Sequence, residues 1–157
     1  MSSVLSDVLA KKIDELAARY PVKQAALLPV LHLVQNEKGF LSPEDEQDVA
    51  GRLGILPVKV REVVTFYTMF RRSPVGKYHI QVCTNLSCSL AGGDGLVGRL
   101  ETRLGIALGG TTPDGKFTLT GVECLGACET APCLMINFDY HGNLDAAGLD
   151  KILEGLA

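Results

Sequence analysis

The sequence lacks the features of a nucleic-acid-binding or membrane-spanning chain. Its formal net charge is −3, and no block of five or more like charges occurs, so no nucleic acid partner is expected. Apolar stretches such as Ala25–Val30 and Leu134–Ile136 are far shorter than the roughly 20 residues that cross a bilayer. We therefore expect no direct insertion into a membrane.

A secretion signal and a disulfide framework are also missing. Met1 and Ser2 are followed by Asp7 and Lys11 without the basic start and apolar segment of a signal peptide. Cysteine is scarce, with an odd total of five in 157 residues, whereas disulfide-stabilised domains are dense in paired cysteines. We expect a reducing, cytoplasmic location, in which these cysteines are free, reactive or bound to metal.

The first half of the chain has the pattern of helices and contains no cysteine. Apolar side chains recur at steps of three or four residues, as on one face of an amphipathic helix. These signals predict helices over Val4–Tyr20, over Gln24–Glu37 with Gly39 as its stop, from Ser42-Pro43 to Gly51–Gly54, and from Pro57 onward. Pro29 leaves two possibilities, because the second helix either begins near Leu28 or is kinked at the proline.

The fourth predicted helix is apolar on nearly all sides. One stripe consists of Val60, Val63, Val64, Tyr67 and Phe70, and Phe66 and Met69 make the opposite side apolar too. A helix of this kind is buried on several sides. Burial within its own domain and docking against a partner subunit both explain the pattern.

After a linker at Arg71–Gly76, the second half changes to short strands and helices. The pattern predicts strands over Tyr78–Val82, Phe117–Val122 and Cys133–Phe138, and helices over Leu96–Leu104 and Ala146–Leu156. That order is typical of a small α/β layer fold. We therefore expect a helical domain over residues 1–72 and an α/β domain over residues 77–157.

Four cysteines form two pairs, Cys83 and Cys88 with four residues between them, and Cys124 and Cys128 with three. Each pair begins where a predicted strand ends, so the two loops are expected to lie side by side on one rim of the sheet. Four thiolates from two loops suit a [2Fe–2S] cluster or a structural zinc ion. A redox dithiol, or cysteines without a ligand, is the third possibility.

The residues between the paired cysteines favour the iron–sulfur interpretation. Zinc knuckles usually space their ligands by two residues, which neither loop does. Thr84–Ser87 and Leu125–Ala127 are mainly small or uncharged, and their backbone N–H groups are free to point at sulfur, as around iron–sulfur clusters. No histidine lies inside either loop, whereas a Rieske-type cluster needs two.

Motifs in both halves closely resemble those of one family, the thioredoxin-like [2Fe–2S] ferredoxin subunit of respiratory complex I, the bacterial NADH-quinone oxidoreductase. The resemblance covers almost the whole chain. The motifs are Cys83–Cys88, Val122–Pro132 and Ile136-Asn137 in the second half, and Leu31–Gln35, Gly39–Leu41 and Val64–Phe70 in the first.

The resemblance implies an α+β protein with an N-terminal helical bundle followed by a thioredoxin-like ferredoxin domain. It implies one [2Fe–2S] cluster held by Cys83, Cys88, Cys124 and Cys128, beside the flavin of an NADH-oxidising module. FMN and NADH would be bound only by the partner flavin subunit, with a further iron–sulfur subunit nearby, in the cytoplasmic peripheral arm of NADH:quinone oxidoreductase. The chain would thus be part of an oxidoreductase and not catalytic alone. Gly92–Gly95 does not fit the dinucleotide fingerprint.

Two further functions stay open. One is the equivalent small subunit of a soluble NAD-linked hydrogenase or formate dehydrogenase, and the other is a stand-alone thioredoxin-like ferredoxin. The helical first half argues against the stand-alone ferredoxin, because a free carrier needs only the cluster domain.

The chain departs from the family at Cys133, where an apolar residue is usual. Cys133 is interpreted either as a small buried side chain at the start of a strand or as a fifth, exchangeable ligand or redox partner. Glu123 and Glu129 flank the second cysteine pair, either as solvated charges or as negative charges that lower the potential of the cluster.

Overall fold

A computed structural model describes residues 5–156, so that Val4, the start of the first predicted helix, lies outside the described residues. The chain divides into two compact units between Pro74 and Val75. This division falls inside the segment Arg71–Gly76, for which the sequence predicts a linker. The assignment of two domains, residues 1–72 and 77–157, stays a prediction.

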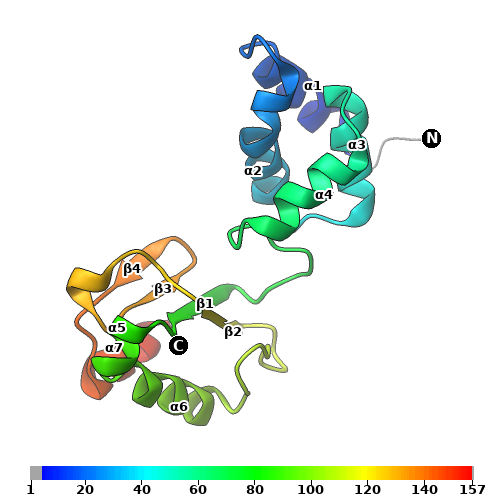
Figure 1. The fold of residues 1–157 in the computed structure, drawn as a ribbon. Helices are drawn as coiled ribbons and strands as arrows, with labels where there is room; N and C mark the ends of the chain where they lie inside the picture. The colour runs from blue at the N-terminus through cyan, green and yellow to red at the C-terminus, as the bar shows by residue number, and fades with distance from the viewer. Residues whose placement is uncertain (1–4, 157) are drawn as a thin grey trace. The chain divides into compact units, whose positions relative to one another are not determined.

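All regular elements that residues 5–74 form in the first unit are helical (Figure 1). Its elements are α1 (Asp7–Ala17), the 3₁₀ turn η1 (Lys23–Ala26), α2 (Leu27–Lys38), α3 (Pro43–Leu53) and α4 (Pro57–Phe66). Local sequence signals fix several of their ends. The Ser42 hydroxyl accepts from the Asp45 N–H, and the Asp45 carboxylate accepts from the Ser42 N–H, which is a capping box. Gly39 ends α2 at φ +86°, in the left-handed region that glycine adopts readily.

The structure decides between the two interpretations of Pro29. Helix α2 begins at Leu27, and the preceding residues form η1 instead of the predicted first turn. Pro29 is therefore the third residue of α2, where a backbone N–H has no partner within the helix. The missing N–H of proline therefore breaks no hydrogen bond within the helix. The structure agrees with the interpretation that the second helix begins near Leu28.

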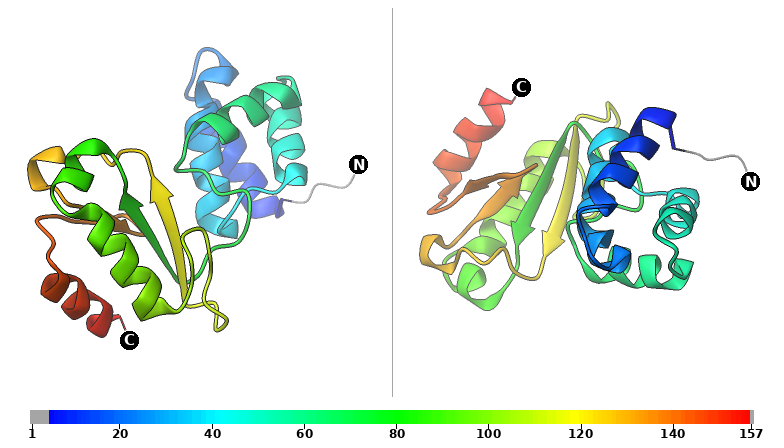
Figure 2. Two further views of the ribbon diagram at one scale, coloured as in Figure 1. Left: turned by 60° about the horizontal axis from the view of Figure 1, so that its bottom comes forward. Right: turned by 90° about the horizontal axis from the view of Figure 1, so that it is seen from above.

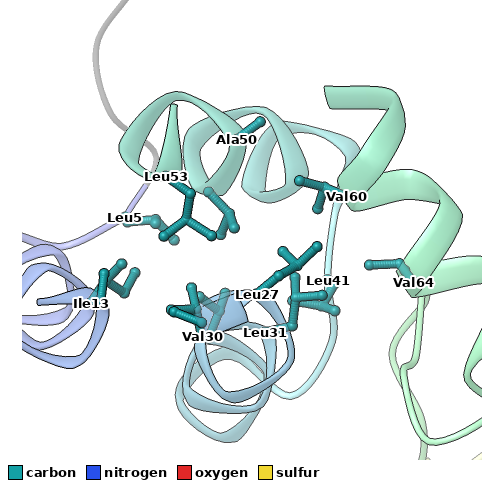
Figure 3. Close-up of a cluster of buried hydrophobic side chains, with 14 of the residues drawn as sticks. Leu5, Ile13, Leu27, Val30, Leu31, Leu41, Ala50, Leu53, Val60 and Val64 are labelled. Atoms are coloured by element: carbon teal, nitrogen blue, oxygen red, sulfur yellow. The ribbon is translucent and has the colours of Figure 1, made fainter. Parts of the chain in front are cut away.

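The core of the first unit is formed by aliphatic side chains from all four α-helices (Figure 3). Helix α4 ends at Phe66, earlier than the predicted stripe, which ran on to Phe70. Val60, Val64 and Phe70 are buried in this core, whereas the side chains of Phe66 and Met69 are 78% and 44% exposed. Burial within the unit therefore explains the apolar stripe that ends at Phe70. It does not explain Phe66 and Met69, the apolar residues predicted for the opposite side.

The segment after α4 is held in place by one buried amide. The Gln35 side chain donates from Nε2 to the Met69 carbonyl at 2.9 Å and accepts from the Arg71 N–H at 2.7 Å. Gln35 is itself buried, so both hydrogen bonds satisfy polar groups inside the unit. These two hydrogen bonds hold the segment after α4 in a non-helical conformation, in which Phe70 is buried.

The second unit is a four-stranded sheet covered by helices (Figure 1). Its elements are β1 (Tyr78–Cys83), α5 (Leu86–Leu90), α6 (Gly93–Leu104), β2 (Phe117–Val122), the 3₁₀ turn η2 (Cys128–Thr130), β3 (Leu134–Ile136), β4 (Asp139–His141) and α7 (Ala146–Gly155). The strand order is β2-β1-β3-β4, with β1 parallel to β2 and the other pairs antiparallel.

Two local predictions are corrected by the structure. Cys88 lies on the short helix α5 and not in a loop. The predicted strand Cys133–Phe138 is shortened to Leu134–Ile136, because the chain reverses at Asn137, whose φ is +56°. The predicted order, a helical first half followed by a second half of strands and helices, is confirmed.

Helices α6 and α7 contact each other and pack on the sheet (Figure 2). Leu96 and Leu100 of α6 and Leu149 of α7 are buried against Ile80 and Leu119 of the two parallel strands. Arg99 and Asp150 join the two helices with a forked ion pair. None of the helices formed by residues 5–156 is long and apolar enough to span a membrane.

We predict that Ser42→Ala destabilises the helical unit by about 0.5–2 kcal/mol, because it removes the acceptor for the Asp45 N–H at the start of α3. Ser42→Asp keeps a hydrogen-bond acceptor at the same place, so it should lose much less stability than Ser42→Ala. Urea unfolding followed by far-UV circular dichroism measures both. Equal losses for the two variants would show that the cap does not stabilise this helix.

Candidate metal centre

The parallel pairing of β1 and β2 brings the two cysteine loops to one edge of the sheet. The last residue of β1, Cys83, is in register with the last residue of β2, Val122. Strands that run in the same direction end at the same edge, so both loops leave from there. The Thr84 N–H extends the pairing by donating to the Val122 carbonyl at 2.9 Å.

The first loop is ordered by α5. The Asn85 side chain accepts from the Leu86 N–H at 2.9 Å and caps the N-terminus of this helix. Cys88 follows on α5 and is buried. A Cβ at Gly93 would lie 2.7 Å from the Cys88 carbonyl oxygen, so a glycine is required for α6 to start so close. The backbone of Cys88 is therefore fixed from two sides.

The second loop is ordered by hydrogen bonds at both ends. The Gly126 N–H donates to Cys124 Sγ at 3.3 Å, with Gly126 at φ +72°, where any other residue is strained. The Thr130 hydroxyl donates to the Ala127 carbonyl at 3.1 Å. The Tyr140 hydroxyl, on β4, donates to the Leu125 carbonyl at 3.2 Å. The loop is thus anchored to the neighbouring strand.

Three of the five cysteines gather at the base of the two loops. The Sγ atoms of Cys83, Cys88 and Cys133 all lie within 4.8 Å of one another, and those of Cys88 and Cys133 are 3.8 Å apart. All three residues are buried. Cys124 and Cys128 are exposed and do not belong to this group. The predicted site residues are therefore divided between a buried pair and an exposed pair.

The two loops meet at Cys83. Its Sγ lies 3.9 Å from the carbonyl oxygen of Glu123, in the second loop. Burial alone would raise the pKa of the Cys83 thiol, but the backbone N–H groups of Asn85 and Leu125 hold it below its ordinary value. One of these donors comes from each loop, so a negative charge on this sulfur is stabilised from both sides.

The other two buried thiols stay protonated more readily. Burial, the largest cause, raises the pKa of Cys88. Burial and the neighbouring Cys88 raise the pKa of Cys133 to about 12. At neutral pH and without a bound metal, Cys133 is therefore a neutral thiol.

The donor set fits an iron–sulfur cluster. The one group of three or more metal-binding side chains found among residues 5–156 consists of cysteines, and soft thiolates select iron–sulfur clusters, zinc or copper(I). Backbone N–H groups already point at Cys83 and Cys124, as expected around cluster ligands. The sequence indicated such donors but gave no sign of the contact from Tyr140, because its partner Leu125 lies in another part of the chain.

Comparison with known proteins agrees with this donor set. The family model "Thioredoxin-like [2Fe-2S] ferredoxin" matches residues 13–157. A subunit of the NADH-quinone oxidoreductase of Rhizobium meliloti is 51% identical over 146 residues, which cover 93% of this chain and 87% of that protein. NADH-quinone oxidoreductase subunit 2 of Thermus thermophilus is 42% identical over 147 residues, which cover 92% of this chain and 81% of that protein.

A solved structure is similar in fold. It is an NAD⁺-reducing [NiFe]-hydrogenase in the air-oxidized state, with a TM-score of 0.70 and 25% sequence identity. The similarity covers 83% of this chain but only 22% of the hydrogenase chain. The resemblance seen in the sequence motifs is thus confirmed by relatives over most of the chain.

We predict that Cys133 is the slowest cysteine to react with iodoacetamide in the reduced, metal-free protein. A pKa near 12 leaves on the order of one thiolate in ten thousand at pH 8, and only the thiolate is alkylated. Because the pKa is raised, the labelling rate should increase about tenfold for each pH unit from 7 to 9. Mass spectrometry of the cysteine peptides measures it.

The control for this labelling is the protein unfolded in urea, in which all cysteines should react at similar rates. Labelling of Cys133 in the folded protein as fast as that of exposed Cys124 would contradict both its burial and its raised pKa.

Proposed function

Because this chain belongs to the thioredoxin-like [2Fe–2S] ferredoxin family, we propose that it is an electron-transfer subunit of an NADH-quinone oxidoreductase. In this proposal it holds one [2Fe–2S] cluster next to the flavin of the NADH-oxidising module. Subunits of such oxidoreductases match the chain over more than nine-tenths of its length. The chain is then part of an oxidoreductase and supplies no catalytic residue of its own.

The observation that carries the proposal is the convergence of two cysteine loops at one sheet edge. We assign Cys83, Cys88, Cys124 and Cys128 as the ligands, two from each loop. When bound, the cluster would accept and release one electron. The chain itself contributes buried thiols, which keep water away from one side, and backbone N–H groups that offset the negative charge of the sulfurs.

The partner is proposed to be the subunit that binds FMN and NADH, with a further iron–sulfur subunit in the same assembly, on the cytoplasmic side of the membrane. Exposed apolar side chains support an interaction surface. Leu86 and Leu90 are 70% and 80% exposed on α5, the helix that carries Cys88, and Phe66 is exposed at the end of α4. Single exposed apolar side chains are common, but adjoining ones mark interaction surfaces, and Leu86 and Leu90 lie one turn apart on α5.

An NAD-linked hydrogenase is the second candidate host. The similarity in fold to the NAD⁺-reducing [NiFe]-hydrogenase favours it, but the relatives of 42% and 51% identity are NADH-quinone oxidoreductase subunits. The two hosts differ in their other chains. Subunits that co-purify with the protein from its own cells would distinguish them.

We predict that the full chain, reconstituted anaerobically with iron and sulfide, binds two iron and two sulfide ions, because two pairs of thiolates complete the ligand set of one such cluster. Reduction should give the EPR signal of a spin-half [2Fe–2S]⁺ state. Cys124→Ala and Cys128→Ala should each lose most of the bound iron. These two side chains are exposed, so their loss should leave the fold intact.

Cys133→Ala is the matched control for the ligand variants. It should keep the cluster and cost about 1–2 kcal/mol of stability, as a small truncation in a buried position does. One zinc ion per chain without visible absorbance, in anaerobically prepared protein, would disprove the iron–sulfur assignment.

We predict that Phe66→Asp weakens binding to the flavin subunit by about tenfold or more, the effect of losing a large apolar anchor from an interface. The side chain is 78% exposed, so the free protein should fold and bind its cluster normally. Val8→Asp, at a similarly exposed aliphatic position on α1, is the control. Equal affinities of both variants and the wild type would remove the end of α4 from the interface.

A further inference from the structure

The fifth cysteine lies within the metal centre but outside the proposed set of four ligands. We propose that Cys133 is a reserve ligand, whose thiolate takes the place of Cys88 on the cluster when Cys88 is lost. This inference rests on the proposed iron–sulfur function and extends its ligand set by one residue.

The backbone of Cys133 is fixed beside the first cysteine loop. The Cys83 N–H donates to the Cys133 carbonyl at 3.2 Å, and the next residue along, Leu134, pairs with Val82 of β1. Cys133 therefore belongs to the same sheet edge as Cys83, although it is far from it in the sequence. Neither of these contacts involves the exposed cysteines of the second loop.

The distance between the two sulfurs is that of two ligands of one metal ion. Metal–thiolate bonds of about 2.3 Å at a tetrahedral angle place two sulfur ligands roughly 3.8 Å apart. Cys88 Sγ and Cys133 Sγ are 3.8 Å apart, and Cys83 Sγ is within 4.8 Å of both. The Sγ of Cys133 thus lies as close to the Sγ of Cys88 as a second ligand of the same metal ion would.

The exchange is chemically balanced. One thiolate replaces another, so the charge of the ligand set is unchanged and no electron is transferred. Cys133 gives up its thiol proton as its sulfur binds, and a Cys88 thiolate that is displaced takes up a proton, so the exchange leaves the number of protons unchanged. Cys83, Cys88 and Cys133 are all buried, so water competes poorly for the vacated position.

The experiment compares iron and sulfide content of the full chain after anaerobic reconstitution, in single and double variants. Cys88→Ala should keep at least half of the cluster, with a changed EPR spectrum. The iron content of Cys88→Ala/Cys133→Val should be at least fivefold lower than that of Cys88→Ala. Cys133→Val alone should keep the full cluster. Cys88→Ala losing as much iron as the double variant would overturn the proposal.

Matched controls separate this role from a general effect on folding. Cys128→Ala and Cys128→Ala/Cys133→Val should hold equally little iron, because Cys133 lies near Cys88 and outside the reach of the exposed pair. Cys88→Ser keeps the side-chain volume in case Cys88→Ala fails to fold. Where Cys88→Ala does not fold and Cys88→Ser is used in its place, the cluster should be retained only when Cys133 is present. Retention in Cys88→Ser/Cys133→Val would then show that serine suffices and would overturn the proposal.

The iron content of the wild-type chain distinguishes failure of the proposed function from failure of the reserve ligand. If the wild-type chain binds no iron–sulfur cluster, the proposed function fails and the reserve ligand fails with it. If the wild type binds the cluster and Cys88→Ala does not, only the reserve ligand is wrong.

Discussion

The parallel pairing of β1 with β2 is the constraint on which the metal centre depends. With Cys83 opposite Val122, both loops begin at the same height and the second loop reaches the sulfur of Cys83. Because successive strand residues point to opposite faces, a register shift of one residue would turn Cys83 away from its partners. The buried contacts of α6 and α7 with Ile80 and Leu119 fix this register. The core of the second unit therefore determines the geometry of the sulfurs.

Local signals allowed much of the fold to be predicted, and long-range pairing explains the rest. Ser42 and Gly39 act through neighbouring backbone groups, so their sequence patterns predict helix ends directly. Helix α5 has five residues, too short for a periodic pattern to show. The approach of Cys133 to Cys88 spans 45 residues of sequence. It follows from the antiparallel pairing of β3 with β1, which no local pattern specifies.

The end of α4 shows how tertiary structure overrides a helical pattern. The stripe from Val60 to Phe70 has the spacing of one helix face, yet the helix ends at Phe66. The two hydrogen bonds of Gln35 redirect the chain, so Phe70 is buried while Phe66 and Met69 face outward. The sequence alone left burial and docking as two explanations of this region. In the structure, burial explains Phe70 but not Phe66 and Met69, for which docking against a partner stays a prediction.

The candidate metal centre is asymmetric, because three of its cysteines are buried and two are exposed. Cys83, Cys88 and Cys133 lie inside the unit, where burial disfavours charge and excludes water. Cys124 and Cys128 lie at the surface, on a loop that Tyr140 anchors to β4. Under the proposed ligand assignment, a partner that exchanges the electron would come nearest to the cluster on the side of Cys124 and Cys128, which are exposed. Cys133, the proposed reserve ligand, lies on the buried side, away from the surface at which such a partner would dock.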